Sequence, residues 1–151
     1  MLIKLALYDF DGVMTDNKVI VDQNGYESVS VNRSDGLAVQ LIKELDIKQI
    51  IVSTEENIVV SRRAEKLNIE CYQSISDKSS AVKEIAKSNG VNLENVAFIG
   101  NDINDLEAMK ICGHAFCPQD ARIEVKKISC KVFDSQGGSG VIRDFYELLT
   151  S

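Results

Sequence analysis

The sequence predicts a doubly wound α/β fold, in which helices cover both faces of a mainly parallel β-sheet. Two observations lead to this prediction. From Asp35 onward, short apolar runs alternate with amphipathic segments, and residues that start or stop helices stand between the runs. A chain that alternates strand and helix is typical of a parallel sheet with helices packed on its two faces.

The strands are expected at the short apolar runs. The first run lies in the stretch LALYDFDGVMTD, residues 5–16, and ends at two aspartates. Runs of this length, bounded by turn residues, are consistent with buried strands of a parallel sheet. The later strands are expected at residues 47–52, 70–73, 96–99, 115–117 and 130–133.

The helices are expected between these strands. Apolar residues repeat at helical spacing over residues 37–45 and again over 81–86. Ser53 and Glu56 have the spacing of a capping box, and Asp77 can cap the second helix. Helix stops are expected at two glycines, Gly90 and Gly113.

One segment interrupts the alternation of strands and helices. Residues 18–31, KVIVDQNGYESVSV, alternate in a strand-like way on either side of Asn24-Gly25, which is a strong hairpin signal. We therefore expect a β-hairpin that projects just after the first strand. The chain has no internal repeat, no low-complexity tract and one proline, so a single domain is expected over residues 1–151.

Charge and hydropathy exclude several kinds of partner. The chain carries 23 acids and 17 bases, a net charge of −6, which leaves no basic surface for nucleic acid or for an anionic membrane. No apolar run approaches ~18 residues and no signal peptide is recognisable, so no membrane association is expected. These features favour a cytoplasmic protein.

The cysteines are expected to be reduced thiols that act as small buried hydrophobic residues. Cys112, His114 and Cys117 could be read as part of a zinc site, but their spacing matches no standard site and His114 is the only histidine. The other two cysteines are Cys71 and Cys130.

Side chains that carry chemistry follow the ends of successive predicted strands. Because ligands bind beyond the carboxyl ends of the strands in an open parallel sheet, we expect these side chains to converge. Lys78 differs from the others in that it begins a predicted helix. The set comprises Asp9, Asp11, Ser53, Thr54, Lys78, Asn101, Asp102 and Asp105.

Such a group is suited to phosphate chemistry. Converging carboxylates raise one another's pKa values unless a hard cation such as Mg²⁺ offsets their charge. The Ser53 or Thr54 hydroxyl and nearby backbone amides can hold phosphate oxygens, while Lys78 balances negative charge. Asp9 can then attack phosphorus, and Asp11 can protonate the leaving oxygen and later deprotonate water.

Each of these groups also has a plain structural alternative. Two aspartates after a strand often form a turn, Ser53 can be a helix cap, and Lys78 can be a solvated side chain. A receiver domain that accepts phosphate also places acids and a lysine at strand ends. It needs an aspartate at the end of the third strand, and residues 72–75 contain none. The order of the groups along the sheet favours the catalytic interpretation.

Four motifs together resemble those of haloacid dehalogenase superfamily phosphatases. They are DFDGVMT, IIVST, Lys78 within SDKSSA, and IGNDINDLEAM, and the resemblance covers essentially the whole chain. It implies a Rossmann-like fold, an aspartyl-phosphate intermediate, Mg²⁺ as cofactor, and Gly12 beside Ser53 and Thr54 at the phosphate. A hairpin in place of a cap domain resembles the capless branch that acts on phosphorylated nonulosonic and octulosonic acids.

The resemblance to this branch also implies partners and a substrate. In the branch, hairpins assemble a homotetramer in which a neighbouring subunit helps to close each active site. STEENIVVSRRAEKL resembles the nonulosonate 9-phosphate phosphatases and the phosphatase-like domains linked to acylneuraminate cytidylyltransferases. The octulosonate 8-phosphate enzymes typically have Gly-Arg where this chain has Thr54-Glu55. The expected substrate is N-acylneuraminate or ketodeoxynonulosonate 9-phosphate, with octulosonate 8-phosphate as the alternative.

By the same resemblance, further residues bind substrate. Glu55 is expected to select the substrate, while Arg63 and Lys66 reach a neighbour's site and bind the substrate carboxylate, which an arginine fork can grip. The alternative is that Arg63 and Lys66 lie on a solvated helix face. GGSGVIRDF, residues 137–145, also matches the branch, and its glycines could form an anion nest supported by Arg143 or a simple connector.

One departure from the family pattern concerns the metal. The fourth motif usually begins with an aspartate, and here the residue is Asn101, whose amide oxygen can bind a hard cation without adding charge. The expected metal ligands are Asp9, Asp11, Asn101 and Asp102, with Asp105 positioning Lys78 or water. Asn101 also motivates a further alternative, a weakly active or inactive domain that partners a sugar-acid cytidylyltransferase.

Overall fold

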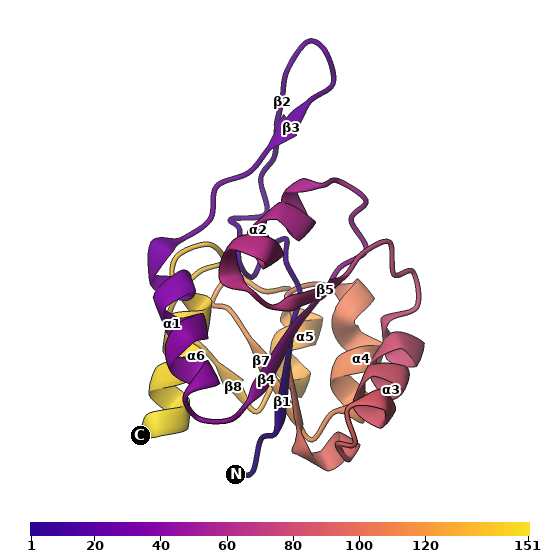
Figure 1. Cartoon of the computed structure of the whole chain (residues 1–151), viewed down its shortest axis with the longest axis vertical. Coiled ribbons are helices and arrows are strands. Elements are labelled where there is room, and N and C mark those ends of the chain that lie inside the picture. Colours follow the sequence, from indigo (N-terminus) through magenta and orange to yellow (C-terminus); the bar gives the residue numbers. More distant parts are fainter.

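The computed structural model describes residues 1–151, which form a six-stranded parallel sheet and a small antiparallel hairpin (Figure 1). The strand order is β5-β4-β1-β6-β7-β8. The predicted strands are confirmed, with their ends within one residue of the expected positions. Their bounds are β1 Leu5–Tyr8, β4 Lys48–Val52, β5 Glu70–Tyr72, β6 Val96–Ile99, β7 His114–Cys117 and β8 Lys131–Val132.

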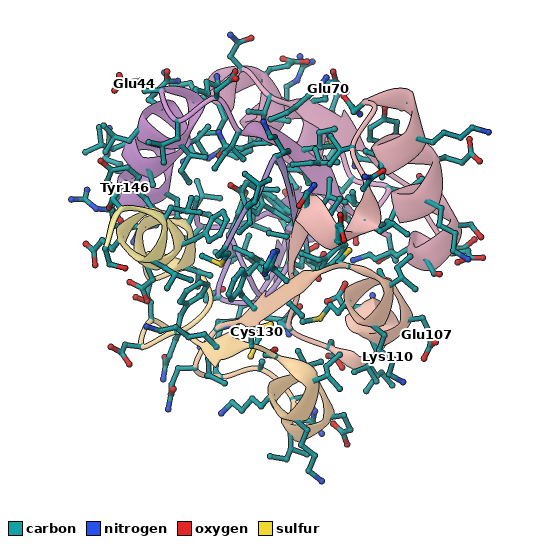
Figure 2. The ribbon with its side chains drawn as sticks, turned by 90° about the horizontal axis from the view of Figure 1, so that it is seen from below. Glu44, Glu70, Glu107, Lys110, Cys130 and Tyr146 are labelled. Carbon is teal, nitrogen blue, oxygen red and sulfur yellow. The ribbon has the colours of Figure 1, made fainter.

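Helices cover both faces of this sheet, as the alternation predicts. The six α-helices are α1 Arg33–Lys43, α2 Val59–Leu67, α3 Lys78–Ser88, α4 Leu106–Ile111, α5 Ile123–Ile128 and α6 Val141–Thr150. Two short 3₁₀ turns, Leu93–Asn95 and Ile103–Asp105, flank β6. Figure 2 looks along the strands and shows α1 and α6 on one side of the sheet, with α3, α4 and α5 on the other.

Each face of the sheet has its own apolar core. Tyr8 and Ile51 face the core under α1, α2 and α6, whereas Leu7 and Ile50 face the core under α3, α4 and α5. Successive strand residues point to opposite faces, so a strand buried on both sides is apolar throughout. This explains why the strands appear in the sequence as continuous apolar runs rather than alternating ones.

The chain reverses its direction of travel across the sheet at β1. After β1 it adds β4 and β5 on one side, then crosses back to place β6, β7 and β8 on the other. In doubly wound sheets the crevice at such a reversal, at the carboxyl ends of the strands, is where ligands bind. Asp9 and Asp11 directly follow β1 at this point.

Two expected helix boundaries have different outcomes. Asp77 caps α3, since its side chain accepts a hydrogen bond from the backbone of Ser80, which confirms that prediction. The capping box of Ser53 and Glu56 is wrong. A loop intervenes before α2 begins at Val59, and the buried Ser53 hydroxyl instead accepts a hydrogen bond from the backbone N–H of Glu55.

The hairpin is present and projects beyond the carboxyl ends of the strands (Figure 1). Its strands are β2 Ile20–Val21 and β3 Glu27–Ser28, which pair in antiparallel register. Gly25 has a φ of 83° in the turn, a conformation that glycine adopts without strain. No second domain covers the carboxyl end of the sheet, which agrees with the expected absence of a cap.

The cysteines are all free thiols. Cys117 is buried, and burial raises the pKa of Cys112 to about 12. The prediction that all four are buried holds for Cys117 only. Cys71 and Cys112 are partly buried, and Cys130 is exposed where α5 leads into β8 (Figure 2). Around Cys112, His114 and Cys117 there is no group of three His, Cys, Asp or Glu side chains placed to share a metal ion. None of the helices is both long and apolar enough to span a membrane.

Candidate active site

Asp9 lies buried at the carboxyl end of β1. Its Oδ1 accepts a hydrogen bond of 2.8 Å from the backbone N–H of Phe10 and lies 3.0 Å from Nζ of Lys78. Burial and the nearby charge of Asp105 raise the pKa of Asp9 well above its ordinary value, although Lys78 acts in the opposite direction. The carboxylate is therefore held in one orientation and is only partly compensated.

Lys78 is the positive group of this buried cluster. It is the first residue of α3, which Asp77 caps, and its ammonium group lies between Asp9 and Asp105, 2.7 Å from Oδ1 of the latter. Burial alone would lower the pKa of Lys78, but the two carboxylates raise it above its ordinary value. Lys78 is therefore charged and fixed beside Asp9.

Asp105 holds Lys78 from behind and does not line the open site. It is fully buried, and its second oxygen accepts hydrogen bonds from the backbone N–H groups of Asn101 at 2.9 Å and Asp102 at 3.3 Å. Asp105 thus joins the turn after β6 to the start of α3. This arrangement fits the role expected for Asp105, the positioning of Lys78.

The turn after Asp9 requires glycine at position 12. Gly12 has a φ of 83°, and a Cβ atom there would collide with the side-chain amide of Asn101. Both the backbone conformation and the close approach favour glycine over any residue with a side chain. Gly12 therefore lets the turn after β1 meet the turn after β6.

Thr15 orients Asp11, and sequence reasoning missed it. Its buried hydroxyl lies 3.4 Å from Oδ1 of Asp11 and accepts hydrogen bonds from the backbone N–H groups of Gly12 and Asn17. Burial and Glu55 raise the pKa of Asp11, while Thr15 lowers it. Thr15 is the last residue of the DFDGVMT motif, four residues after Asp11. This short spacing could have indicated that its hydroxyl lies near the Asp11 carboxylate.

Most of the expected catalytic groups surround one small pocket of about 160 Å³, here called the inner pocket. Every residue that lines it is polar, which suits a phosphate group. Ser53, Lys78 and Asp105 are buried and are not part of its lining, and Lys78 contacts both Asp9 and Asp105. Asn17 and Asn104 were not expected. The lining residues are Asp9, Asp11, Asn17, Thr54, Asn101, Asp102 and Asn104.

The amide of Asn101 bears on whether a metal ion fits this pocket. One atom of that amide lies 2.9 Å from Oδ2 of Asp9 and 3.1 Å from the backbone oxygen of Asp11. If this atom is nitrogen, it donates a hydrogen bond to each. If it is oxygen, its distances to these two oxygens are close to the spacing of about 2.9 Å between adjacent ligands of an octahedral ion with bonds of about 2.0–2.1 Å.

The donor set therefore fits a hard divalent cation. With the amide oxygen of Asn101 turned toward them, Asp9 and the carbonyl of Asp11 would share a cation with Asn101, and Asp102 lines the same pocket. Oδ1 of Asp102 already accepts a 2.7 Å hydrogen bond from the N–H of Ile103, so this side chain also serves the turn after β6. Two of the three oxygens that would share the cation belong to an amide and a backbone carbonyl, so the cation would gain charge compensation mainly from Asp9.

A second pocket of about 270 Å³, the outer pocket, adjoins the inner one. Asp11 and Asn17 line both, so a group attached to a phosphate in the inner pocket would extend into the outer one. The hairpin stem forms one wall and the segment from Glu55 to Val59 forms the other. Its lining residues are Asp11, Asn17, Lys18, Val19, Glu27, Val29, Glu55, Asn57 and Val59.

Three expected substrate-binding residues lie away from these pockets. Arg63 and Lys66 line a separate pocket of about 240 Å³ between α1 and α2, together with Arg33. The Arg63 guanidinium donates a hydrogen bond to the backbone oxygen of Asn32. Arg143 lies on α6, and its Nε is 3.4 Å from Glu147. Within one chain, the structure does not bring these three residues to Asp9.

The glycine segment before α6 is not an open anion nest. The buried Oδ1 of Asp35 accepts a 3.1 Å hydrogen bond from the backbone N–H of Ile142, so a carboxylate of this chain already occupies the start of α6. Burial raises the pKa of Asp35 to about 6, although hydrogen bonds from the start of α6 oppose this. A Cβ atom on Gly137 would collide with the backbone oxygen of Gly12, so this glycine allows close packing against the catalytic turn.

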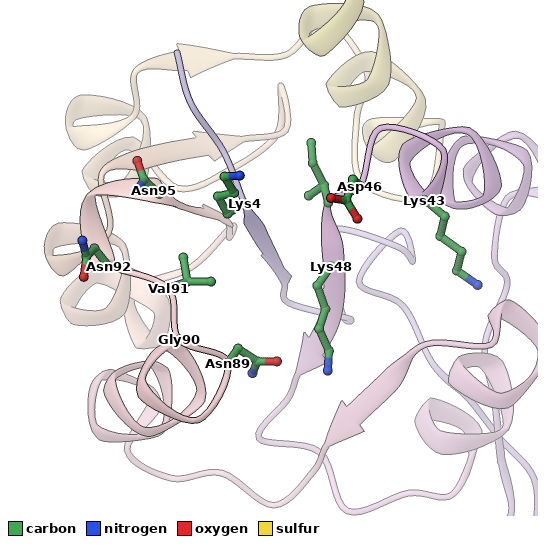
Figure 3. Close-up of a pocket in the computed structure, with 10 residues that line it drawn as sticks. Lys4, Lys43, Asp46, Lys48, Asn89, Gly90, Val91, Asn92 and Asn95 are labelled. Atoms are coloured by element: carbon green, nitrogen blue, oxygen red, sulfur yellow. The ribbon is translucent and has the colours of Figure 1, made fainter.

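A larger pocket of about 530 Å³ lies at the opposite edge of the sheet, where β1 and β4 begin (Figure 3). Two of its three lysines have partners, since Lys43 donates to the last carbonyls of α2 and Lys48 pairs with Glu70. It contains no buried acid or base, and it is far from the turn after β1. Its size therefore does not make it the candidate site.

The arrangement at the inner pocket can support phosphoryl transfer. Asp9 is a fixed carboxylate with one face open to the pocket, and Asp11 is a more exposed carboxylate two residues away with a raised pKa. One can attack phosphorus while the other gives up and then takes a proton. Lys78 offsets negative charge beside Asp9.

Comparisons with known proteins agree with this geometry. The haloacid dehalogenase-like hydrolase family matches residues 37–144. The 3-deoxy-D-manno-octulosonate 8-phosphate phosphatase of Haemophilus influenzae is 32% identical over 148 residues, which cover 97% of this chain and 82% of that protein. The N-acylneuraminate cytidylyltransferase of Oncorhynchus mykiss is 28% identical over 153 residues, which cover 97% of this chain and 35% of that protein.

Solved structures of sugar-acid phosphatases also match this chain. The 3-deoxy-D-manno-octulosonate 8-phosphate phosphatase from Moraxella catarrhalis, in complex with magnesium, phosphate and KDO, matches with a TM-score of 0.94 at 30% identity. The match covers 97% of this chain and 85% of the other. The matches in sequence and in structure both extend over nearly the whole length of the chain. The chain therefore belongs to the haloacid dehalogenase-like hydrolase family.

Proposed function

We propose that this chain is a Mg²⁺-dependent phosphatase that hydrolyses the 9-phosphate of a sialic-acid-like sugar acid, N-acylneuraminate or ketodeoxynonulosonate 9-phosphate. The observation that carries the phosphatase activity is the buried Asp9, paired with Lys78 and open to a wholly polar pocket beside Asp11. The coarser activity, hydrolysis of a sugar-acid phosphate, is supported by relatives from two bacteria. The nine-carbon substrate is supported by Glu55, which lines the outer pocket.

In this proposal each residue has a distinct task. Asp9 attacks phosphorus and forms the aspartyl-phosphate, Asp11 first protonates the leaving oxygen and then deprotonates the attacking water, and Lys78 neutralises charge beside Asp9. The hydroxyl groups of Ser53 and Thr54 donate to phosphate oxygens, next to the turn at Gly12. Asp9, Asp11, Asn101 and Asp102 would hold Mg²⁺, which would supply charge neutralisation at the phosphate.

A specific observation also favours the 8-phosphate of 3-deoxy-manno-octulosonate as substrate, because the relatives that the chain matches over most of both lengths are named for it. Phosphate release from N-acetylneuraminate 9-phosphate, ketodeoxynonulosonate 9-phosphate and octulosonate 8-phosphate, with and without Mg²⁺, distinguishes the two. A higher kcat/KM for a nine-carbon acid supports the proposal, and a higher value for the octulosonate overturns the choice of substrate.

The third possibility is an inactive domain that partners a sugar-acid cytidylyltransferase, since the chain resembles about a third of such a protein. The retained Asp9, Asp11 and Lys78 argue against it, because a scaffold does not need a buried carboxylate and lysine at a polar pocket. If all three phosphates are turned over only at the rate of an Asp9→Asn blank, and Mg²⁺ does not bind, the scaffold function takes precedence.

We further propose that the 151 residues act as one cytoplasmic phosphatase domain that assembles as a homotetramer. The exposed hairpin presents apolar side chains, Val19, Ile20, Val21 and Tyr26, that a second copy could cover. Arg33, Arg63 and Lys66 share a pocket with no acidic residue in its lining, so no carboxylate there competes with one from a neighbour's site. Arg63 also donates to the backbone oxygen of Asn32. Sedimentation equilibrium tests the assembly, and a monomer at micromolar concentration would refute it.

Asp11→Asn is expected to lower kcat by about 10²–10⁴, the range for loss of general acid and base catalysis. The effect depends on the leaving group. 4-Nitrophenolate needs no proton to leave, so the variant should still form the aspartyl-phosphate from 4-nitrophenyl phosphate and then stall. Rapid-mixing measurements should show a burst of nitrophenolate in Asp11→Asn. Full steady-state activity on the sugar-acid phosphate would contradict the role of Asp11.

Asn101→Asp is expected to tighten Mg²⁺ and to lower the stability of the metal-free protein. The new carboxylate would lie about where the amide lies now, 2.9 Å from Oδ2 of Asp9, so two like charges meet unless a cation separates them. Calorimetric titration with Mg²⁺ and thermal unfolding in EDTA measure the two effects. Asn104→Asp is the matched control, because it adds the same charge to the inner pocket from its rim. Equal Mg²⁺ affinity in the two variants would contradict a ligand role for residue 101.

A further inference from the structure

The outer pocket has a fixed wall and a hairpin wall. On the fixed wall, Oε1 of Glu55 accepts hydrogen bonds of 3.1 Å from the backbone N–H groups of both Glu56 and Asn57. The side-chain amide of Gln73 donates to the backbone oxygens of Glu55 at 3.0 Å and Asn57 at 2.8 Å. These bonds hold Glu55 in one orientation and leave its second oxygen for a ligand.

On the hairpin wall, Glu27 supplies a second carboxylate. It lies on β3, where it pairs in register with Val21, and its side chain lines the same pocket as Glu55 and Asp11. Glu27 forms no ion pair with any residue of the chain, although it is on the same ribbon as Lys18. Its charge reaches Asp11, whose pKa is raised by burial, by Glu55 and, less strongly, by Glu27.

The chemistry of this pocket favours hydroxyl groups over anions. Glu27 and Glu55 present carboxylate oxygens that can only accept hydrogen bonds, Asn17 and Asn57 can both donate and accept, and Lys18 is the only cation. Hydrogen bonds from neutral hydroxyls to carboxylates are stronger than those between neutral groups. The apolar side chains of Val19, Val29 and Val59 can contact the carbon chain of the same ligand.

We propose that Glu27 is a specificity-determining residue, which together with Glu55 accepts hydrogen bonds from hydroxyl groups of the polyhydroxylated leaving group. This inference rests on the proposed phosphatase function and adds a task for the hairpin, which contributes to the active site of its own chain as well as projecting toward other copies. Phosphates whose leaving group has no hydroxyl do not use Glu27.

The test compares Glu27→Gln with wild type on two kinds of substrate. The variant keeps the shape of the side chain and removes its charge. We expect kcat/KM for the sugar-acid phosphate that the wild type prefers to fall about tenfold or more, mainly through KM, as expected for loss of a charged hydrogen bond. The value for 4-nitrophenyl phosphate should stay within about twofold, because that substrate lacks hydroxyl groups.

Two matched controls separate recognition from structure. Glu56→Gln makes the same charge change on an exposed neighbour of Glu55 that does not line the pocket, and Ser28→Ala alters the residue next to Glu27, which points to the opposite face of the ribbon. Both should retain wild-type kinetics. An equal loss on both substrates, a loss accompanied by a changed oligomeric state, or no loss at all would overturn the role of Glu27. Wild-type protein that hydrolyses neither substrate would instead refute the phosphatase function.

Discussion

Asp9→Asn is expected to reduce phosphate release to the level of the uncatalysed blank while the protein remains folded. An amide cannot attack phosphorus as an anion, and no other carboxylate has the same position. Asp105 is fully buried and pairs with Lys78, and Asp11 has its Oδ1 3.4 Å from the Thr15 hydroxyl. The amide has nearly the same volume as the carboxyl group, and its oxygen can still accept from the N–H of Phe10.

The stability of this variant gives an independent check. Burial and Asp105 raise the pKa of Asp9, so the charged form of Asp9 costs free energy in the metal-free folded state. A carboxyl group with a raised folded-state pKa contributes less stability as the pH rises through that pKa. The neutral Asp9→Asn protein should therefore unfold at an equal or higher temperature than wild type at pH 7 in EDTA.

Activity and stability are measured on the same protein, so that loss of activity can be distinguished from loss of folding. Phosphate release is measured on a sugar-acid phosphate and on 4-nitrophenyl phosphate, and unfolding is followed by circular dichroism. Asp16→Asn is a suitable control, because this exposed aspartate follows the catalytic turn and does not line the inner pocket. Activity in Asp9→Asn comparable to wild type would contradict the assignment of Asp9 as nucleophile and with it the roles of Asp11 and Lys78.

Much of the fold could be predicted because its strands are buried on both sides. Residues such as Leu7 and Ile51 face two different cores, so each strand is a short apolar run that local pattern alone identifies. The start of α3 at Asp77 could also be predicted from nearby residues, since a capping side chain bonds to the backbone about three residues further along. The capping box predicted at Ser53 was wrong because it rested on local spacing alone. The spacing of Ser53 to Glu56 fits a capping box, but the hydroxyl is buried at the end of β4 and the helix starts later.

The catalytic groups could be placed together because parallel strands bring their carboxyl ends to one edge. Residues that act across the fold had no such signal. Asp35 accepts a hydrogen bond from Ile142, which is 107 residues away, and the sequence of α1 alone indicates only a first-turn acid. The same holds for Gln73 and Glu27. Gln73 bonds to the loop after β4, and Glu27 faces that loop from the hairpin. Short-range sequence patterns do not show how these segments are placed in space.

Lys78→Met is expected to remove both activity and a large part of the stability. The change leaves Asp9 and Asp105 buried without their shared cation, and the loss of one partner of a buried ion pair costs about 3–5 kcal/mol. The cost should shrink as the pH falls. A buried carboxyl group without a cation has a raised folded-state pKa, so stability is lost as the pH rises through that value and is regained toward the unfolded pKa of about 4.

A second substitution separates the electrostatic cost from the catalytic one. In Lys78→Met/Asp105→Asn, the carboxylate that lies 2.7 Å from the lysine becomes neutral, while its amide oxygen can still accept from the N–H of Asn101. Urea unfolding at pH 7 should show that the double variant recovers much of the lost free energy of unfolding, whereas phosphate release stays at the blank level because nothing offsets the charge beside Asp9. Recovery of activity along with stability would mean that Lys78 is only structural. Failure to recover stability would mean that Asp105 is not the group that Lys78 compensates.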